Sequence, residues 1–403
     1  MLIGIFSDSH CGYKYGDEQW KDSFVALNEA INKSLDCDLI LIAGDMFDAR
    51  IPKQEVFAKV AKILSKTQNI PTRTQFLEII NKDKDEVSPL ALRGIPVVAL
   101  HGNHERRSKY MINPIQALEH AGLLIHLNRS TIVFQIDGQK VAIHGMSSVP
   151  ERFAKDVLRE WNPKPIPEAV NILMIHQSVT PYVYSPLEPP SLELEELPKG
   201  FDLYIMGHLH WYDKKILHNA QLLVTGSTIP TSMNRSEAEQ TKAIHKFDGS
   251  IKHIPLENQR KIFWGEFRID PSIKEKVETF ISTISPTKPK PIINITIKGT
   301  LKEGYQPPRF TDLEEKYKHK AIINIKKKFD REGFEEQVEK LRMFREQKLS
   351  PEEYGIKILQ EKMKEVKFNI NINDIFGPLV EGNTDLIFNI LIGEQKTLVE
   401  VKT

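Results

Sequence analysis

The chain has 403 residues, 40% of them hydrophobic and 27% charged, which is typical of a globular protein with two or three domains. A net charge of +1 argues against a uniformly basic nucleic-acid-binding protein. Any polyanion would therefore have to bind to a local patch of basic residues. With only two cysteines, Cys11 and Cys37, a disulfide framework is disfavoured and a reducing compartment is favoured. No apolar run is long enough to cross a bilayer, and the first seven residues are too short for a signal peptide. We therefore expect a cytoplasmic protein.

The first two predicted strands both end in residues that can bind metal ions. Residues 2–6 form an apolar run that leads into Asp8 and His10, and residues 38–43 form a second run that leads into Gly44 and Asp45. The segment between them has helical periodicity. A strand–helix–strand unit implies parallel strands whose C-terminal ends share one edge of a sheet. We therefore expect Asp8, His10 and Asp45 to converge.

The third strand ends in the stretch around which the chain is organised. A helix is predicted over residues 54–65, and residues 66–93 are predicted to be a surface insertion with a short helix at 76–80. The apolar run 96–100 is predicted to be a strand. It is followed by Gly102-Asn103-His104-Glu105, where the glycine permits a turn. Alone, an asparagine–histidine pair would be a polar turn. At the C-terminal edge of a sheet, it lies where α/β folds place ligands.

The rest of the N-terminal part repeats the same pattern. After a helix near residues 114–121, Asp137-Gly138 predicts a hairpin between strands 131–136 and 140–143. The run 172–175 ends at His176, and the run 203–206 ends at Gly207-His208-Leu209-His210. Residues 222–224 and 243–248 are predicted to be the last strands of this part.

Beyond about residue 260 the strand ends no longer carry metal-binding side chains. Strands are predicted at 263–269, 292–297 and 321–325 with a helix at 273–284, which indicates a small α+β domain. A helix at 351–367 and an apolar segment at 385–392, separated by an interruption at Gly377-Pro378, would form a tail. The predicted domains are therefore 1–258, 259–346 and 347–403.

The side chains collected at the strand ends suit divalent metal ions. They are Asp8, His10, Asp45, Asn103, His104, His176, His208 and His210. Carboxylate, amide oxygen and neutral imidazole favour Mn²⁺, with Fe²⁺ or Zn²⁺ as alternatives, and the lack of a thiolate argues against structural zinc. The set exceeds the needs of one ion. It fits a two-metal site with a bridging carboxylate, which activates water and offsets phosphoryl charge during hydrolysis of phosphate esters.

The motifs Asp8-Ser9-His10, Gly44-Asp45, Gly102-Asn103-His104-Glu105, His176 and Gly207–His210, in this order, resemble the calcineurin-like metallophosphoesterase superfamily. Within it, residues 45–48, 143–146 and 173–177 resemble the nuclease subunit of the double-strand-break resection complex, the meiotic-recombination-eleven type, whose bacterial counterpart is called SbcD. The resemblance implies an α/β fold in four layers, a β-sandwich flanked by helices. It also implies a small α+β cap domain and a helical C-terminal tail.

Site roles follow from the resemblance. One ion, taken as Mn²⁺, would be held by Asp8, His10, Asp45 and His210, with Asp45 bridging, and a second by Asn103, His176 and His208. His104 would be catalytic, facing the phosphate and stabilising or protonating the leaving group. One residue departs from the pattern: many members carry a histidine three residues after the bridging aspartate, where this chain has Asp48. We interpret Asp48 either as a difference on the substrate side or as a residue that orients a metal-binding histidine.

Other polar residues are expected to play supporting parts. Glu105 would support the site from outside the ligand set, and His144 would lie in the core or behind the ligands. Surface or turn positions are predicted for His120, His126, His218, His245 and His253.

Partners also follow from the resemblance. Arg106, Arg107, Lys109 and the basic run at 316–331 would contact the DNA backbone, although a solvated face explains such a run equally well. Apolar residues between Ile375 and Leu391 would bind the coiled coil of an ATPase of the Rad-fifty type, or else pack on their own domain. A homodimer without membrane contact is expected, acting at the nucleoid.

Three functions remain open at this point. The first is a Mn²⁺-dependent DNA exonuclease and endonuclease that acts in double-strand-break repair with the ATPase. The second is a small-molecule or cyclic-nucleotide phosphodiesterase on the same core. The third is a catalytically silent scaffold, against which the complete ligand set argues.

Overall fold

The structure is a computed structural model, and it describes most of the chain before residue 332 and parts of the tail. The described residues are 1–108, 110–184, 192–231, 240–301, 308–331, 356, 359–360, 372–380, 387 and 390. The chain packs as two compact units, of which the first comprises Met1–Gly265, Glu275–Ile295 and Phe310–Lys326. The domain boundaries predicted at residues 258 and 346 stay a prediction.

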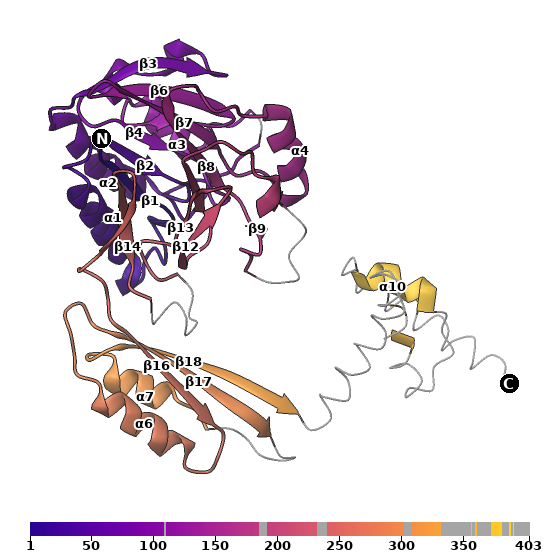
Figure 1. The fold of residues 1–403 in the computed structure, drawn as a ribbon. Helices are drawn as coiled ribbons and strands as arrows, with labels where there is room; N and C mark the ends of the chain where they lie inside the picture. The colour runs from indigo at the N-terminus through magenta and orange to yellow at the C-terminus, as the bar shows by residue number, and fades with distance from the viewer. Residues whose placement is uncertain are drawn as a thin grey trace. The chain divides into compact units, whose positions relative to one another are not determined.

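Two sheets form the centre of the first unit (Figure 1). The six-stranded sheet has the order β15-β14-β1-β2-β4-β5. Its strands are β1 (Ile3–Phe6), β2 (Leu39–Ile42), β4 (Val97–Ala99), β5 (Ile125–His126), β14 (Ala243–Phe247) and β15 (Ile251–Pro255). The strands β1, β2, β4 and β5 run parallel. Their C-terminal ends therefore share one edge, as the sequence predicts.

The second sheet has seven strands in the order β12-β13-β11-β8-β7-β6-β3. They are β3 (Thr74–Ile80), β6 (Ser130–Ile136), β7 (Gln139–Met146), β8 (Ala169–His176), β11 (Leu203–Gly207), β12 (Tyr212–Leu217) and β13 (Ala220–Thr225). β7, β8, β11 and β13 are parallel, while β6 and β7 form the predicted hairpin, in which Asp137 and Gly138 both have positive φ.

β3 corrects the interpretation of residues 66–93 as a surface insertion with a short helix. Residues 74–80 are a strand that pairs antiparallel with β6, and the ring centroid of Phe76 lies 6.4 Å from that of Phe134. The strand lies at the sheet edge, and most of its residues are exposed or half-buried, so its apolar pattern is weak. Its partner lies more than 50 residues further along the chain, which is why local periodicity misses it.

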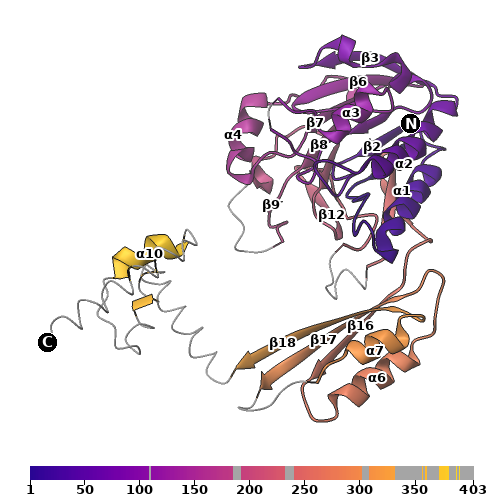
Figure 2. The same cartoon turned by 180° about the vertical axis from the view of Figure 1, so that it is seen from behind.

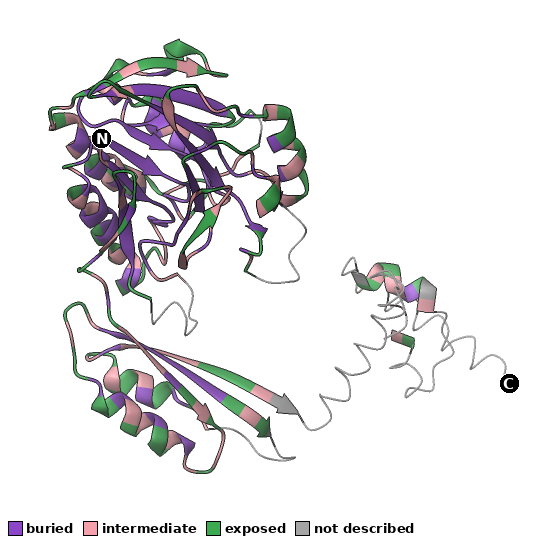
Figure 3. Ribbon diagram, viewed as in Figure 1, coloured by how far each residue is buried: buried purple, intermediate pink, exposed green. Residues whose placement is uncertain are grey.

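Four layers result from packing on both faces of each sheet. Apolar side chains from the two sheets, such as Ile5, Leu41, Ile143 and Ile205, form the central core. Helices α1 (Asp22–Lys33), α2 (Gln54–Leu64) and α3 (Pro114–His120) cover the outer face of the six-stranded sheet. Helix α4 (Glu151–Trp161) covers the outer face of the other sheet, opposite α1 and α2 (Figures 1 and 2). Figure 3 shows the inner strands of both central sheets as buried, whereas β3 and β12 are mostly exposed or half-buried. The predicted four-layer fold is confirmed.

The later part of the chain contains a three-stranded sheet, β16-β17-β18, and two helices. These elements are β16 (Ile262–Arg268), α6 (Ile273–Thr283), β17 (Ile292–Leu301), α7 (Thr311–Tyr317) and β18 (Ile322–Arg331). All three predicted strands and the predicted helix are present, and α7 is additional.

One tail helix is described, α10 (Ile372–Val380), and it contains Pro378. The predicted interruption at Gly377-Pro378 is therefore wrong: near the end of a short helix, the proline removes a single backbone N–H donor. Apart from single residues, the predicted segments 351–367 and 385–392 lie outside the described residues. Among the described residues, no helix is both long and apolar enough to cross a membrane.

Candidate metal centre

Loops that follow β1, β2, β4, β8 and β11 meet at one edge of the two central sheets. Main-chain bonds join the first two loops: the N–H of Asp8 donates to the carbonyl of Gly44, and that of His10 donates to the carbonyl of Asp45, both at 3.0 Å. The loop after β4 joins them through the N–H of His104, which donates to Asp45 Oδ1 at 3.0 Å. The structure thus brings the predicted side chains together from both sheets.

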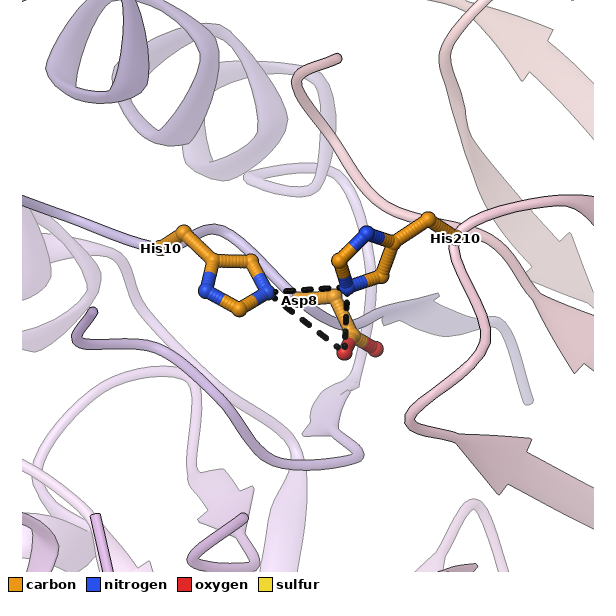
Figure 4. A group of neighbouring side chains, drawn as sticks. All are labelled: Asp8, His10 and His210. Atoms are coloured by element: carbon orange, nitrogen blue, oxygen red, sulfur yellow. Dashed lines mark hydrogen bonds and ion pairs between the residues drawn. The ribbon is translucent and has the colours of Figure 1, made fainter. Parts of the chain in front are cut away.

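A first cluster contains Asp8, His10 and His210 (Figure 4). The Nε2 atoms of His10 and His210 lie 3.0 Å apart, and they lie 3.8 Å and 3.6 Å from Asp8 Oδ1. Asp8 Oδ1 is buried and has no hydrogen-bond partner among the described residues. A buried carboxylate oxygen that accepts no hydrogen bond and faces two imidazole nitrogens is the arrangement that a divalent cation would stabilise once the rings are deprotonated. The donor set fits a metal ion.

A second cluster is built around the amide of Asn103. Its Oδ1 lies 3.2 Å from His176 Nε2 and 2.9 Å from His208 Nδ1. His176 Nε2 in turn lies 3.3 Å from Asp45 Oδ2. Asp45 has ligand atoms within 4.8 Å of those of His176 and His208, and equally of those of His10 and His104. Asp45 therefore stands between the two clusters, as a bridging carboxylate must.

Three of the histidines are held through one ring nitrogen so that the other faces a cluster. Nδ1 of His176 donates to the carbonyl of Ala43 at 2.6 Å, and Nδ1 of His10 lies 3.1 Å from Asp48 Oδ1. Nδ1 of His210 bonds to the hydroxyl of Thr231. A bond of this kind sets the tautomer and ring orientation of a metal-binding imidazole. Nε2 of each ring is thereby directed into the site.

His104 differs from the other histidines in its exposure. Its side chain is 40% exposed, whereas that of His10 is 1% exposed. Nδ1 of His104 lies 3.1 Å from the carbonyl oxygen of Asp48 and 3.6 Å from its Oδ1. Of the two interpretations of Asp48, the contacts favour the one in which it orients a metal-binding histidine, and they add a second role, since Asp48 also contacts the exposed His104.

Backbone strain and close packing mark the same loops. Asp8, His10, Asp45 and His208 all have φ between +43° and +87°, a region that costs non-glycine residues about 1–3 kcal/mol and occurs most often at functional sites. A Cβ atom at Gly44 would lie 2.3 Å from His176 Nδ1, and one at Gly102 would lie 2.0 Å from Asp45 Oδ1. Both glycines are required because the ligands approach the main chain so closely.

Electrostatics couple the carboxylates and imidazoles. Burial by itself would raise the pKa of Asp45, but the neighbouring His176 and His10 lower it to about 2. Burial would lower the pKa of both histidines, yet the carboxylates prevail: Asp48 and Asp8 raise the pKa of His10 to about 10, and Asp45 raises that of His176 to about 9. The pocket therefore favours positive charge. A divalent cation would displace the protons of the two rings.

Glu105 supports the metal-binding loops from outside the ligand set, as the sequence predicts. The side chain is fully buried, and its two oxygens accept the N–H groups of Phe47 and Gly102, both at 2.8 Å. It thereby ties the loop after β2 to the loop after β4. His144 also lies in the core, bonded to Thr131 and Asn171.

Two surface predictions are wrong. His126 and His245 are buried, because each lies on a strand of the six-stranded sheet. His126 Nε2 lies 2.9 Å from His101 Nδ1, next to the loop that carries Asn103. The position of both histidines next to apolar residues is the signal that could have placed them inside.

Sequence reasoning also missed Tyr184. Its hydroxyl donates to the carbonyl of His208 at 2.6 Å, and its ring lies edge-on to the rings of His208 and His210, with centroids 5.4 Å and 5.6 Å away. No local pattern in the sequence indicates this contact. It arises because the segment that follows β9 (Val179–Thr180) contacts the loop after β11.

Comparison with known proteins assigns the fold and the site to a class. Residues 1–212, more than half of the chain, match the family model of the calcineurin-like phosphoesterases. The chain belongs to the calcineurin-like phosphoesterase family. Divalent metal binding follows from membership of this family, and the donor clusters described above provide for it.

Curated relatives narrow the class further. The chain is 28% identical over 269 residues to the DNA double-strand break repair protein Mre11 of Methanopyrus kandleri, an alignment that covers 62% of this chain and 53% of that protein. It is 27% identical over 322 residues to the protein of the same name from Sulfolobus acidocaldarius, covering 75% of this chain and 76% of that protein. Archaeal Mre11 proteins are therefore homologues of this chain. The chain spans about half the length of the first of them.

Proposed function

We propose that the protein is a Mn²⁺-dependent DNA nuclease, with exonuclease and endonuclease activity, that hydrolyses phosphodiester bonds in double-strand-break repair. The observation that carries this proposal is the position of Asp45 between two donor clusters, beside a histidine that remains exposed. The names of the homologues supply the substrate.

The residue roles proposed from the sequence agree with the contacts in the site. Asp8, His10 and His210 would hold one ion, Asn103, His176 and His208 the other, and Asp45 both. Two such ions, when bound, supply a water nucleophile at neutral pH and offset charge on the phosphoryl oxygens.

His104 would act on the other side of the reacting phosphate. Its main chain is fixed by Asp45 and its Nδ1 by Asp48, so the ring is oriented while its surface remains open to substrate. A positioned imidazole can donate a proton to a leaving alkoxide, a contribution of typically 10²–10⁴-fold. We assign His104 this role.

A basic strip on β18 supports contact with the DNA backbone. Lys326, Lys327 and Lys328 are exposed. Two lysines earlier in the basic run are compensated, since Lys316 and Lys318 bond to Glu278 and Glu315. We therefore narrow the proposed DNA contact to Lys326 and Lys328, since Lys327 donates to the carbonyl oxygen of Pro308, and each phosphate contact would release counterions. Of the basic residues after the catalytic motif, Lys109 lies outside the described residues.

Partners and location are proposals of the same kind. We propose a homodimer that acts on DNA ends in the cytoplasm, at the nucleoid, with a coiled-coil ATPase of the Rad-fifty type bound through the tail. In the described part of the tail, α10 presents the half-exposed Leu379, while Ile375 is buried. Most of the apolar residues predicted for this contact lie outside the described residues.

One assay separates the proposal from its alternatives. The purified protein is incubated with Mn²⁺ and either linear plasmid DNA or a chromogenic phosphodiester, with a chelator control. We expect DNA to be degraded only with Mn²⁺, and we expect His104→Leu to bind Mn²⁺ normally but to lose cleavage. Hydrolysis of the chromogenic ester without DNA degradation would indicate a small-molecule phosphodiesterase. Activity on neither substrate would indicate a scaffold.

A further inference from the structure

Lys242 is a buried lysine behind the first donor cluster that neither the motifs nor the proposed mechanism uses. It directly precedes β14, in the six-stranded sheet, and only 5% of it is exposed. Its Nζ donates to the carbonyl oxygen of His210 at 2.9 Å and to Ser227 Oγ at 2.8 Å. His210 follows β11 and Ser227 follows β13, so the ammonium group connects one central sheet to loops of the other.

His210 is the ligand of the first cluster that has the least packing to hold it. Its side chain is 17% exposed, whereas those of Asp8 and His10 are 0% and 1% exposed. Its ring is oriented by Thr231, and its carbonyl oxygen accepts hydrogen bonds from Lys242 and Ser227. Besides Lys242, the N–H and the Oγ of Ser227 both donate to this carbonyl oxygen, each only at 3.4 Å. The charged bond from Lys242 is the shorter and stronger of these restraints.

Burying an ammonium group is unfavourable unless hydrogen bonds compensate it, and an apolar side chain of equal length would fill the space without that cost. A lysine near a nuclease site would ordinarily contact phosphate. Lys242 is too deeply buried for that, and its donors point to protein oxygens. The short charged bond to the carbonyl oxygen of His210 is the contact that links Lys242 to the first donor cluster.

We propose that Lys242 is a positioning residue for the first metal ion: it holds the main chain of His210 so that Nε2 of this ring stays beside Asp8 and His10. The inference rests on the proposed metal assignment. It predicts a selective effect on one ion, because the second cluster of Asn103, His176 and His208 has no part in the contacts of Lys242 described here.

The test measures Mn²⁺ binding to the full chain by two methods, calorimetry and electron paramagnetic resonance. Two Mn²⁺ ions that share a bridging ligand are magnetically coupled, so their spectrum differs from that of a single ion. In Lys242→Met we expect one of the two binding affinities to fall about tenfold or more, as for other residues that orient ligands. The coupled spectrum should change to the single-ion spectrum that His210→Ala gives. Lys246→Met is the matched control, since Lys246 lies on β14, the strand that Lys242 precedes, but bonds to Asp36.

Other outcomes are decisive as well. Normal binding of both ions by Lys242→Met, or an equal loss of both, would overturn the proposal even if the melting temperature fell. A weaker salt dependence of DNA binding would instead indicate a phosphate contact. Should Lys242→Met fail to fold, Lys242→Gln is the second variant, since it keeps a polar side chain but removes the ammonium group, and it must weaken the binding of the same Mn²⁺ ion selectively. Failure of the unaltered protein to bind two coupled ions would refute the metal assignment itself.

Discussion

Replacing Gly102 with alanine should disable both metal sites through one methyl group. The added Cβ would lie 2.0 Å from Asp45 Oδ1, 2.4 Å from Asp45 Cγ and 2.6 Å from its backbone nitrogen. An ordinary carbon–oxygen contact is about 3.4 Å, so the methyl group and the carboxylate would have to separate by about 1.4 Å. Gly102 cannot easily retreat, because its N–H is bonded to the buried Glu105.

The expected effect is larger on function than on folding. Overpacking of this kind typically costs about 1–3 kcal/mol of unfolding free energy. A displacement of about 1 Å at a reacting centre costs about 10²-fold in rate. Because Asp45 stands in both clusters, we expect Gly102→Ala to weaken both Mn²⁺ ions and to lower DNA cleavage at least 10²-fold.

Calorimetric Mn²⁺ titration, thermal unfolding and a DNA cleavage assay on the same preparation measure the three effects. Gly16→Ala is the control, since a Cβ there meets nothing within 4 Å and introduces only the backbone strain of φ +95°. It should lower the melting temperature without affecting metal binding. If Gly102→Ala kept normal affinity for both ions, the close approach of Gly102 to Asp45 would not control the site and the reasoning would be refuted.

Three further predictions concern the ligands, the pH dependence and the tail. Asp45→Ala should lose both ions and His176→Ala mainly one; metal analysis of the purified variants checks this, and equal losses would contradict it. In the metal-free protein, the pKa values of His10 and His176 lie above the unfolded value of 6.5, so their stabilisation is complete below pH 6.5 and is lost as the pH rises through about 9 to 10. The melting temperature of the metal-free protein should therefore fall across that range. A melting temperature that does not change with pH would contradict the raised pKa values of His10 and His176. Removing residues 368–403 should leave Mn²⁺-dependent cleavage intact, because every candidate ligand precedes residue 211, and should abolish co-purification with the ATPase. If the truncated chain still captured the ATPase, the tail would not be part of the interface with it.

The candidate site is largely predictable because its information is local. Each ligand-bearing loop directly follows a short apolar run, and parallel strands bring their C-terminal ends to one edge. Asp8, Asp45, Asn103 and His176 could therefore be placed together before any contact was known. The order of the motifs along the chain then indicated the family.

Other features depend on contacts between segments far apart in the chain, and only the tertiary structure decides them. The strand 74–80 looks like an exposed segment until β6 pairs with it, and His126 and His245 look like surface residues until the strands around them are buried. The partners of Asp48 and Lys242 lie 38 and 32 residues away, at His10 and His210. A side chain's hydrogen-bond partner is set by the packing of whole layers, so neither residue's role is visible in its neighbours. The sequence by itself determined which residues can bind metal, and the packing of the two sheets decided which residues hold them in place.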